Sequence, residues 1–290
     1  MERLQVAIEK ARAQREGQPQ ADTPAAAPAT GSGGSAPQTT AGPTASSRTS
    51  PDLESLWAAL KPIDTTRISL TTSQITTLRP GEASAPFDML RTRMLHQAQT
   101  NNWKRIAVVS PHAGCGKTLT VANLAFSLGR QSDVRTMIID FDLRRATLAR
   151  TLGQNPSHTM GDILDGKVAF SAHGMRHGRN VAFGLNSGPV RNPSELLQST
   201  RAREKLFEIE AEYQPDIMLF DVPPLRAADD SIGVLRLVDA AIIVVAAEET
   251  PMSQIDVAER QVAELTNVMG IVLNKCRIMD GEYGYDQYSA

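Results

Sequence analysis

The chain alternates short apolar segments with longer segments of helical character, and this alternation limits its fold more than any other feature. Several of the apolar segments lack polar–apolar alternation, which is typical of parallel strands covered on both faces. The expected strands are residues 105–110, 135–140, 180–186, 216–221, 239–246 and 268–274. Repeated strand–helix–strand units predict a doubly wound α/β fold, with a mainly parallel sheet, helices on both faces and ligands at the carboxyl ends of the strands.

The sequence divides into four regions. Residues 1–16 are expected to form a helix, because a narrow apolar stripe beginning at Leu4 repeats at helical spacing. Residues 17–50 are almost entirely Ala, Pro, Gly, Ser, Thr and Gln, a composition typical of a disordered linker. Residues 51–275 carry the strand–helix alternation and form the expected ATP-binding domain. Residues 276–290 are expected to be a flexible tail.

Bulk properties exclude some classes of function. A net charge of −2 and a pI near 6.2 give no general attraction to nucleic acid or anionic lipid. The two cysteines are far apart and lack the spacing of metal ligands, as expected in a reducing compartment. The longest apolar run, 240–247, is too short to cross a bilayer, and the N-terminus shows no secretory signal pattern. We therefore expect a cytoplasmic protein that reaches the membrane only through a partner.

The segment 110–118, Ser-Pro-His-Ala-Gly-Cys-Gly-Lys-Thr, lies between an expected strand and an expected helix. Gly114 and Gly116 let backbone N–H groups turn toward a phosphate, and the following helix adds its dipole. Lys117 can contact the β- and γ-phosphates of ATP, and the Thr118 hydroxyl can ligate Mg²⁺. The pattern predicts a domain of the P-loop NTPase type. The expected nucleotide-binding residues here are Gly114, Cys115, Gly116, Lys117, Thr118 and Leu119.

Three aspartates end two of the expected strands. Asp140 and Asp142 follow one apolar run, and Asp221 follows another. Single aspartates often cap helices, but three carboxylates beside a phosphate loop exceed what capping requires. Phosphoryl transfer depends on positioning and charge neutralisation, and a tyrosine hydroxyl also needs a proton acceptor. We assign Asp221, with Thr118, to Mg²⁺ binding. Asp140 and Asp142 share the metal-binding and proton-acceptor roles, and the sequence does not decide which residue has which role.

Three of the four tyrosines, Tyr283, Tyr285 and Tyr288, lie in the last eight residues. This end is polar and contains glycine, so it cannot bury the rings, and chain ends are usually mobile. The tyrosines alone would fit an adhesive tail. Beside an ATP site, they are expected to be phosphorylation sites.

Together these segments resemble the bacterial tyrosine kinases, or BY-kinases, of capsule and exopolysaccharide synthesis, in the type made as a separate chain. The shared motifs are Gly116-Lys117-Thr118, Asp140-Phe-Asp142-Leu-Arg144, Asp221-Val-Pro-Pro224 and the tyrosine cluster. Further similarity lies in 161–166, in 187–197 and in 272–274. The resemblance covers roughly residue 87 to the C-terminus.

The resemblance implies a Mg-ATP-dependent protein-tyrosine autokinase whose tail enters the site of a neighbouring copy. It places Asn274 near the adenine. It also implies a transmembrane polysaccharide co-polymerase that activates the kinase at the inner face of the membrane, a tyrosine phosphatase that resets the tail, and control of exopolysaccharide polymerisation and export.

The sequence departs from the family at the helix used for oligomerisation. The family has a glutamate followed by arginines three and six residues later, whereas this chain has Ala85, Asp88 and Arg91. Only the last position keeps the family residue, which puts ring assembly through this helix in doubt. The basic stretches 144–145 and 176–179 are expected to be solvated, although Arg144 could also touch a phosphate or a subunit interface.

Two alternatives remain open at this point. A partition- or positioning-type ATPase of the same superfamily would act as a nucleotide-dependent dimer switch. That group has a lysine where this chain has His112, and no lysine lies between Lys104 and Lys117. A non-catalytic scaffold would bind ATP and hold the polysaccharide machinery together without forming phosphotyrosine.

Overall fold

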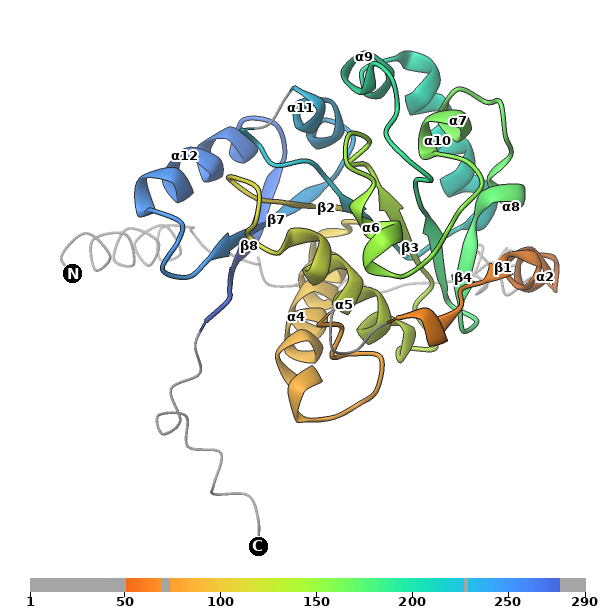
Figure 1. Cartoon of the computed structure of the whole chain (residues 1–290), viewed down its shortest axis with the longest axis horizontal. Helices are drawn as coiled ribbons and strands as arrows, with labels where there is room; N and C mark the ends of the chain where they lie inside the picture. The colour runs from red at the N-terminus through yellow and green to blue at the C-terminus, as the bar shows by residue number, and fades with distance from the viewer. Residues whose placement is uncertain (1–50, 69–73, 227–228, 277–290) are drawn as a thin grey trace, which may run out of the picture. The chain divides into compact units, whose positions relative to one another are not determined.

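The computed structural model describes residues 51–68, 74–226 and 229–276 (Figure 1). Its eight strands form one sheet in the order β1-β4-β5-β3-β6-β2-β7-β8. The expected N-terminal helix 1–16, the expected linker 17–50 and the tyrosines of the tail lie outside the described residues. The strands are β1 (Lys61–Pro62), β2 (Arg105–Val109), β3 (Thr136–Asp140), β4 (Met175–His177), β5 (Val181–Gly184), β6 (Ile217–Asp221), β7 (Ala240–Ala246) and β8 (Asn267–Asn274).

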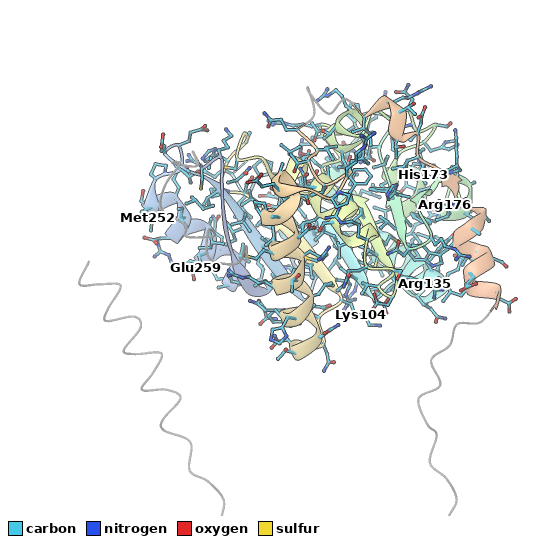
Figure 2. All side chains as sticks on the ribbon, turned by 90° about the horizontal axis from the view of Figure 1, so that it is seen from below. Lys104, Arg135, His173, Arg176, Met252 and Glu259 are labelled. Carbon is cyan, nitrogen blue, oxygen red and sulfur yellow. The ribbon has the colours of Figure 1, made fainter. Side chains whose placement is uncertain are left out.

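All strand pairs are parallel except β4 with β5, which is antiparallel. The register places Asp140 of β3 beside Asp221 of β6, and Val108 of β2 on the other side of Asp221. The carboxyl ends of the three central strands therefore meet at one edge of the sheet. Lys104 and Arg135, labelled in Figure 2, directly precede β2 and β3 and mark the opposite edge.

Helices cover both faces of the sheet, as the sequence predicts for a doubly wound fold (Figure 1). The strands alternate their side chains between the two layers. In β2, for example, Ile106 packs with one cluster and Ala107 with the other. The helices of one face are α4 (Ala85–Asn101), α5 (Lys117–Gly129) and α6 (Thr147–Thr151). Those of the other are α2 (Pro51–Ala59), α7 (Met160–Leu164), α8 (Phe170–His173), α9 (Pro193–Leu197), α10 (Thr200–Tyr213), α11 (Asp230–Leu235) and α12 (Met252–Ala263).

The first described helix, α2, is anchored by one tryptophan. Trp57 is 2% exposed, and its indole N–H donates to the Tyr213 carbonyl over 2.8 Å. The two rings also meet edge to face, with centroids 6.2 Å apart. Large buried aromatic side chains dominate packing energetics, so α2 belongs to the core of the domain. Nowhere in the described ranges does a helix combine the length and hydropathy of a membrane span.

In α4, the helix that the family uses for oligomerisation, Asp88 and Arg91 contact the neighbouring helix α5 of the same chain. Arg91 Nη1 lies 3.4 Å from Asp88 Oδ1 and donates to the Ser127 carbonyl over 3.0 Å. Asp88 also accepts hydrogen bonds from Ser127 and Arg130. Burial raises the pKa of Asp88. The hydrogen bonds from Ser127 and Ser84 and the charges of Arg130 and Arg91 lower the pKa by more than burial raises it, so it is below the usual value. These groups stabilise the α4–α5 contact within one subunit.

Candidate functional site

The loop between β2 and α5 has the backbone geometry of a phosphate-binding loop. Gly114 and Gly116 have φ angles of +89° and +90°, which residues with a Cβ rarely adopt. The helix α5 begins at Lys117, directly after the loop. Its first N–H groups and the positive end of its dipole therefore lie beside the loop, as an anion site requires.

A cavity of about 300 Å³ lies against this loop. Its volume is at the lower end of the range for small-molecule sites. All six loop and helix residues predicted to bind nucleotide, from Gly114 to Leu119, line it. Of the three predicted aspartates, only Asp142 does so. The remaining lining residues are Ser110, Ala113, Arg145, Thr147, Thr151 and Pro224.

The Lys117 side chain turns inward to buried carboxylates. Its Nζ lies 2.6 Å from Asp221 Oδ1 and 4.0 Å from Asp142 Oδ2, and the side chain is 6% exposed. A buried ammonium group is tolerated only when it is paired with opposite charge. Lys117 is therefore both a wall of the cavity and the counter-charge of the acidic strand ends.

Asp140 and Asp221 form a buried carboxylate pair behind Lys117. Both are 0% exposed and lie side by side in the register of β3 and β6. Asp140 Oδ1 accepts the backbone N–H of Asp142 over 3.1 Å, whereas Oδ2 of Asp140 and Oδ2 of Asp221 have no hydrogen-bond partner among the described residues. Burial, and next the charge of Asp221, raise the pKa of Asp140 well above its usual value.

Asp142 differs from Asp140 by facing the cavity. Its side chain is 5% exposed and lines the space beside the loop. Burial raises the pKa of Asp142. The nearby Lys117 ammonium group lowers this pKa and the charge of Asp221 raises it, and the net pKa is above the usual value. The structure thus separates two aspartates that the sequence left together. Asp142 lines the cavity, whereas Asp140 is fully buried and does not.

The donor set fits a divalent cation that arrives with a phosphate. Lys117 supplies one positive charge against three carboxylates, so the fully ionised cluster carries −2 and holds two orphaned oxygens. The described ranges contain no ready-made group of three or more His, Cys, Asp or Glu ligands for a metal. Mg²⁺ commonly takes one or two carboxylates and fills its remaining positions with phosphate oxygens and water. The Thr118 hydroxyl, 3.4 Å from Lys117 Nζ, lines the same cavity.

Asn274, at the end of β8, lies against the loop. Its Nδ2 donates to the Cys115 carbonyl over 2.9 Å. A Cβ at Gly116 would stand 2.0 Å from that same Nδ2, so only glycine permits this approach. The contact fixes the position of the loop relative to β8. The expected contact of Asn274 with adenine stays a prediction.

Sequence reasoning missed several neighbours of the site. Arg145 and Thr147 line the cavity, and the Thr147 hydroxyl lies 3.4 Å from that of Thr118. Both residues follow Asp142 closely in the sequence, and this proximity could have identified them as neighbours of the site. Arg144 is 47% exposed, as expected for a solvated side chain, but its Nε also donates to the buried carboxylate of Asp230 over 2.6 Å. Nothing in the sequence connects these two residues.

Comparisons with known proteins agree with this geometry. Residues 106–283 match the family model described as the CobQ/CobB/MinD/ParA nucleotide binding domain. The chain is 30% identical over 193 residues to the tyrosine-protein kinase CpsD of Streptococcus pneumoniae, covering 65% of this chain and 83% of that protein. It is 32% identical over 208 residues to the tyrosine-protein kinase Wzc of Salmonella typhimurium, covering 69% of this chain. The chain spans only 28% of Wzc and 25% of AmsA from Erwinia amylovora.

A solved structure gives the same assignment. The kinase domain of the Escherichia coli tyrosine kinase ETK aligns with a TM-score of 0.61 and 25% identity, over 78% of this chain and 86% of that one. The match to CpsD covers most of that kinase, and the nucleotide-binding model spans the sheet from β2 to β8. The chain therefore belongs to the bacterial tyrosine kinases, a family of nucleotide-binding tyrosine-protein kinases with the P-loop fold.

Proposed function

We propose that this chain is a Mg-ATP-dependent autokinase that phosphorylates Tyr283, Tyr285 and Tyr288 of its own tail. The observation that carries the proposal is the position of Lys117, buried between Asp221 and Asp142 in the wall of a cavity at a phosphate loop. Membership of a tyrosine kinase family supports tyrosine as the acceptor. The last eight residues supply three candidates.

The proposed phosphate contacts come from the loop. Backbone N–H groups around Gly114 and Gly116 and the start of α5 would bind the phosphates, and Lys117 would neutralise their charge. Thr118, Asp221 and Asp140 would hold Mg²⁺, which supplies charge neutralisation on the transferred phosphoryl group. In the absence of nucleotide, Lys117 keeps Asp221 neutralised. Phosphates then have to compete with that carboxylate for the ammonium group.

The proposed proton acceptor is Asp142. It alone of the three aspartates lines the cavity, so it alone can reach the hydroxyl of an entering tyrosine. Burial raises its pKa, which makes it a stronger base than a solvated aspartate. Asp140 would support it through the 3.1 Å hydrogen bond from the Asp142 backbone N–H to Asp140 Oδ1, which fixes the strand end.

The proposed setting follows from the family. A second copy of the chain would present its tail in trans, and a transmembrane polysaccharide co-polymerase would activate the kinase and recruit it to the inner face of the membrane. A tyrosine phosphatase would reset the tail. Phosphorylation would then regulate exopolysaccharide or capsule polymerisation and export. Family membership is the support for each of these partners.

The test is mass spectrometry of the full chain after incubation with Mg-ATP, with and without the cytoplasmic segment of the co-polymerase. Phosphate is expected on Tyr283, Tyr285 or Tyr288 and should be lost in the triple Tyr→Phe variant. Tyr213→Phe is the matched control, because this fourth tyrosine is fully buried and its hydroxyl has no partner among the described residues.

Asp142→Asn should bind ATP and transfer phosphate at least about a hundredfold more slowly. Demonstrated ATP binding without phosphotyrosine under either condition would instead favour the non-catalytic scaffold.

A further inference from the structure

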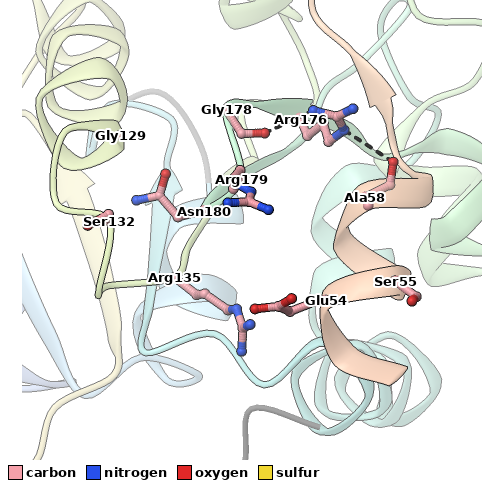
Figure 3. Close-up of a pocket in the computed structure, with 10 residues that line it drawn as sticks. All are labelled: Glu54, Ser55, Ala58, Gly129, Ser132, Arg135, Arg176, Gly178, Arg179 and Asn180. Carbon is pink, nitrogen blue, oxygen red and sulfur yellow. Dashed lines mark hydrogen bonds between the residues drawn. The ribbon is translucent and has the colours of Figure 1, made fainter. Parts of the chain in front are cut away.

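A second cavity lies at the edge of the sheet away from the phosphate loop (Figure 3). Its volume is about 630 Å³, within the range of small-molecule sites. Arg135 and Asn180, which line it, directly precede β3 and β5, so the cavity is at the amino ends of those strands. The nucleotide cavity is at the carboxyl ends. The two sites are therefore separate, and the inference below does not depend on the proposed kinase function.

The walls of this second cavity carry excess positive charge. Arg135, Arg176 and Arg179 line it, against one carboxylate, that of Glu54. If all four are ionised, the lining carries +2. Figure 3 shows the Arg135 guanidinium and the Glu54 carboxylate facing one another from opposite walls, and no ion pair joins them. An uncompensated cluster of guanidinium groups is a common means of binding phosphate or carboxylate.

Two of these arginines have free guanidinium groups. Within the described part of the chain, the side chains of Arg135 and Arg179 form no hydrogen bond or ion pair. Arg135 is partly buried and Arg179 is exposed, whereas the partly buried Arg105 pairs with Asp239 at 2.9 Å. Five donors on each unpaired guanidinium are thus available to an anion entering the cavity.

Hydrogen bonds join the elements around these two arginines. Arg176 donates to the carbonyls of Ala58, Leu60 and Gly178 over 3.3, 3.1 and 2.9 Å, which ties the β4–β5 hairpin to the end of α2 (Figure 3). Arg176 is therefore not simply solvated, contrary to the sequence expectation for 176–179. Asn180 is 5% exposed and donates through Nδ2 to the carbonyl of Gln131 over 2.7 Å. A preformed frame reduces the ordering cost of binding a ligand.

The uncharged lining indicates what else the ligand carries. Ser55, Ser132 and Asn180 offer polar side chains, and Ala58, Gly129 and Gly178 leave space. Among the described residues that line the cavity, none is aromatic and none is an aliphatic residue larger than alanine. Such walls can hydrogen-bond hydroxyl groups and cannot stack on a ring.

We propose that the cavity lined by Arg135, Arg179 and Glu54 binds a small, hydroxyl-rich phosphomonoester, of which a sugar phosphate is the simplest example. The dianionic phosphate matches the +2 lining and would take bidentate hydrogen bonds from the two free guanidinium groups. The hydroxyl groups would meet the serine and asparagine side chains. A phosphotyrosine side chain offers the same phosphate but presents an aromatic ring for which the lining has no partner.

The test is calorimetric titration of the full chain, first saturated with Mg-ADP so that the phosphate loop is occupied. Glucose 1-phosphate is the probe, and saturable one-to-one binding is expected, with none for glucose. Arg135→Gln and Arg179→Gln should each weaken binding at least about tenfold, since each removes a charge-assisted contact. Glu54→Gln should strengthen binding, because it removes the one negative charge of the lining. The matched control is Arg236→Gln, an exposed arginine at the end of α11 outside the cavity, which should bind as the parent chain does.

Three outcomes would overturn the proposal. One is absence of binding to the parent chain at millimolar probe. Another is binding that the arginine substitutions leave unchanged, since the phosphate would then sit elsewhere. The third is tighter binding of phenyl phosphate, or of a phosphotyrosine peptide with the sequence of residues 280–290, than of glucose 1-phosphate. That result would contradict the inference from the polar lining.

Discussion

Replacing Lys117 with methionine tests the energetics of the buried acidic cluster. Among the described residues, Lys117 supplies the one ammonium group within 4.0 Å of Asp221 and Asp142, whose side chains are 0% and 5% exposed, and the substitution removes it. Removing one partner of a buried ion pair typically costs about 3–5 kcal/mol. The chain can limit this cost by protonating a carboxyl group. For a group of ordinary pKa, about 3.9, protonation costs about 4 kcal/mol at pH 7.

The expected loss of unfolding free energy is therefore about 3–4 kcal/mol at pH 7. Because protonation becomes easier by about 1.4 kcal/mol per pH unit, the loss should shrink to about 1.5 kcal/mol at pH 5. Urea unfolding measures both values. Trp57 packs in the core on one face of the sheet and Trp103 against the core on the other, so tryptophan fluorescence reports on both layers.

Two controls separate stability from chemistry. Lys104→Met removes an exposed lysine (Figure 2) and should change stability by less than about 0.5 kcal/mol. The double variant Lys117→Met with Asp221→Asn should recover most of the lost stability, since it removes the unpaired charge. It should still transfer phosphate at least a hundredfold more slowly, as expected when about 2.7–4 kcal/mol of transition-state stabilisation is lost. A single Lys117→Met variant as stable as the parent at pH 7, or equally destabilised at both pH values, would refute the reasoning.

Two further substitutions test the loop and the carboxylate pair. Gly116→Ala forces a Cβ to 2.0 Å from Asn274 Nδ2 at a φ of +90°. The substitution should lower the free energy of unfolding in urea by about 1–3 kcal/mol and weaken binding of a fluorescent ATP analogue. Unchanged stability would contradict the geometry. Asp140 has a raised pKa in the folded chain, so folding takes up a proton there and stability falls as pH rises above about 4. Asp140→Asn should remove that fall in stability. Compared with the parent chain, the variant should therefore gain stability at pH 7 relative to pH 4, and thermal unfolding of both chains at both pH values checks this.

The central strands could be predicted from sequence because they are buried on both faces. All seven residues of β7 are buried, and a strand in that environment is a continuous apolar run. Observed and expected ends of the central strands agree or differ by one or two residues. The short strands β1, Lys-Pro, and β4, Met-Arg-His, were missed because two or three residues of mixed polarity have no detectable period.

The site could be predicted only as far as topology determines it. Acidic residues after parallel strands must meet at one edge, so grouping Asp140, Asp142 and Asp221 with the phosphate loop needed no coordinates. Which aspartate faces the cavity depends on side-chain direction after the strand end, which spacing does not determine. The arginine-lined cavity was also beyond the sequence. Its walls come from α2, the end of α5, the loop before β3 and the β4–β5 hairpin, and α2 and the hairpin are about 120 residues apart along the chain.

The ion pair between Lys117 and Asp221 constrains the order of binding in the proposed reaction. With Asp221 Oδ1 held by Lys117 at 2.6 Å, the carboxylate pair offers a free cation only Oδ2 of Asp221 and Oδ2 of Asp140. Two oxygens beside a resident ammonium group are a poor site for Mg²⁺, which prefers six oxygen ligands. A nucleotide phosphate removes both disadvantages of the site, because it attracts Lys117 away from Asp221 and brings oxygen ligands of its own. The geometry therefore favours joint binding of metal and nucleotide over binding of the metal alone.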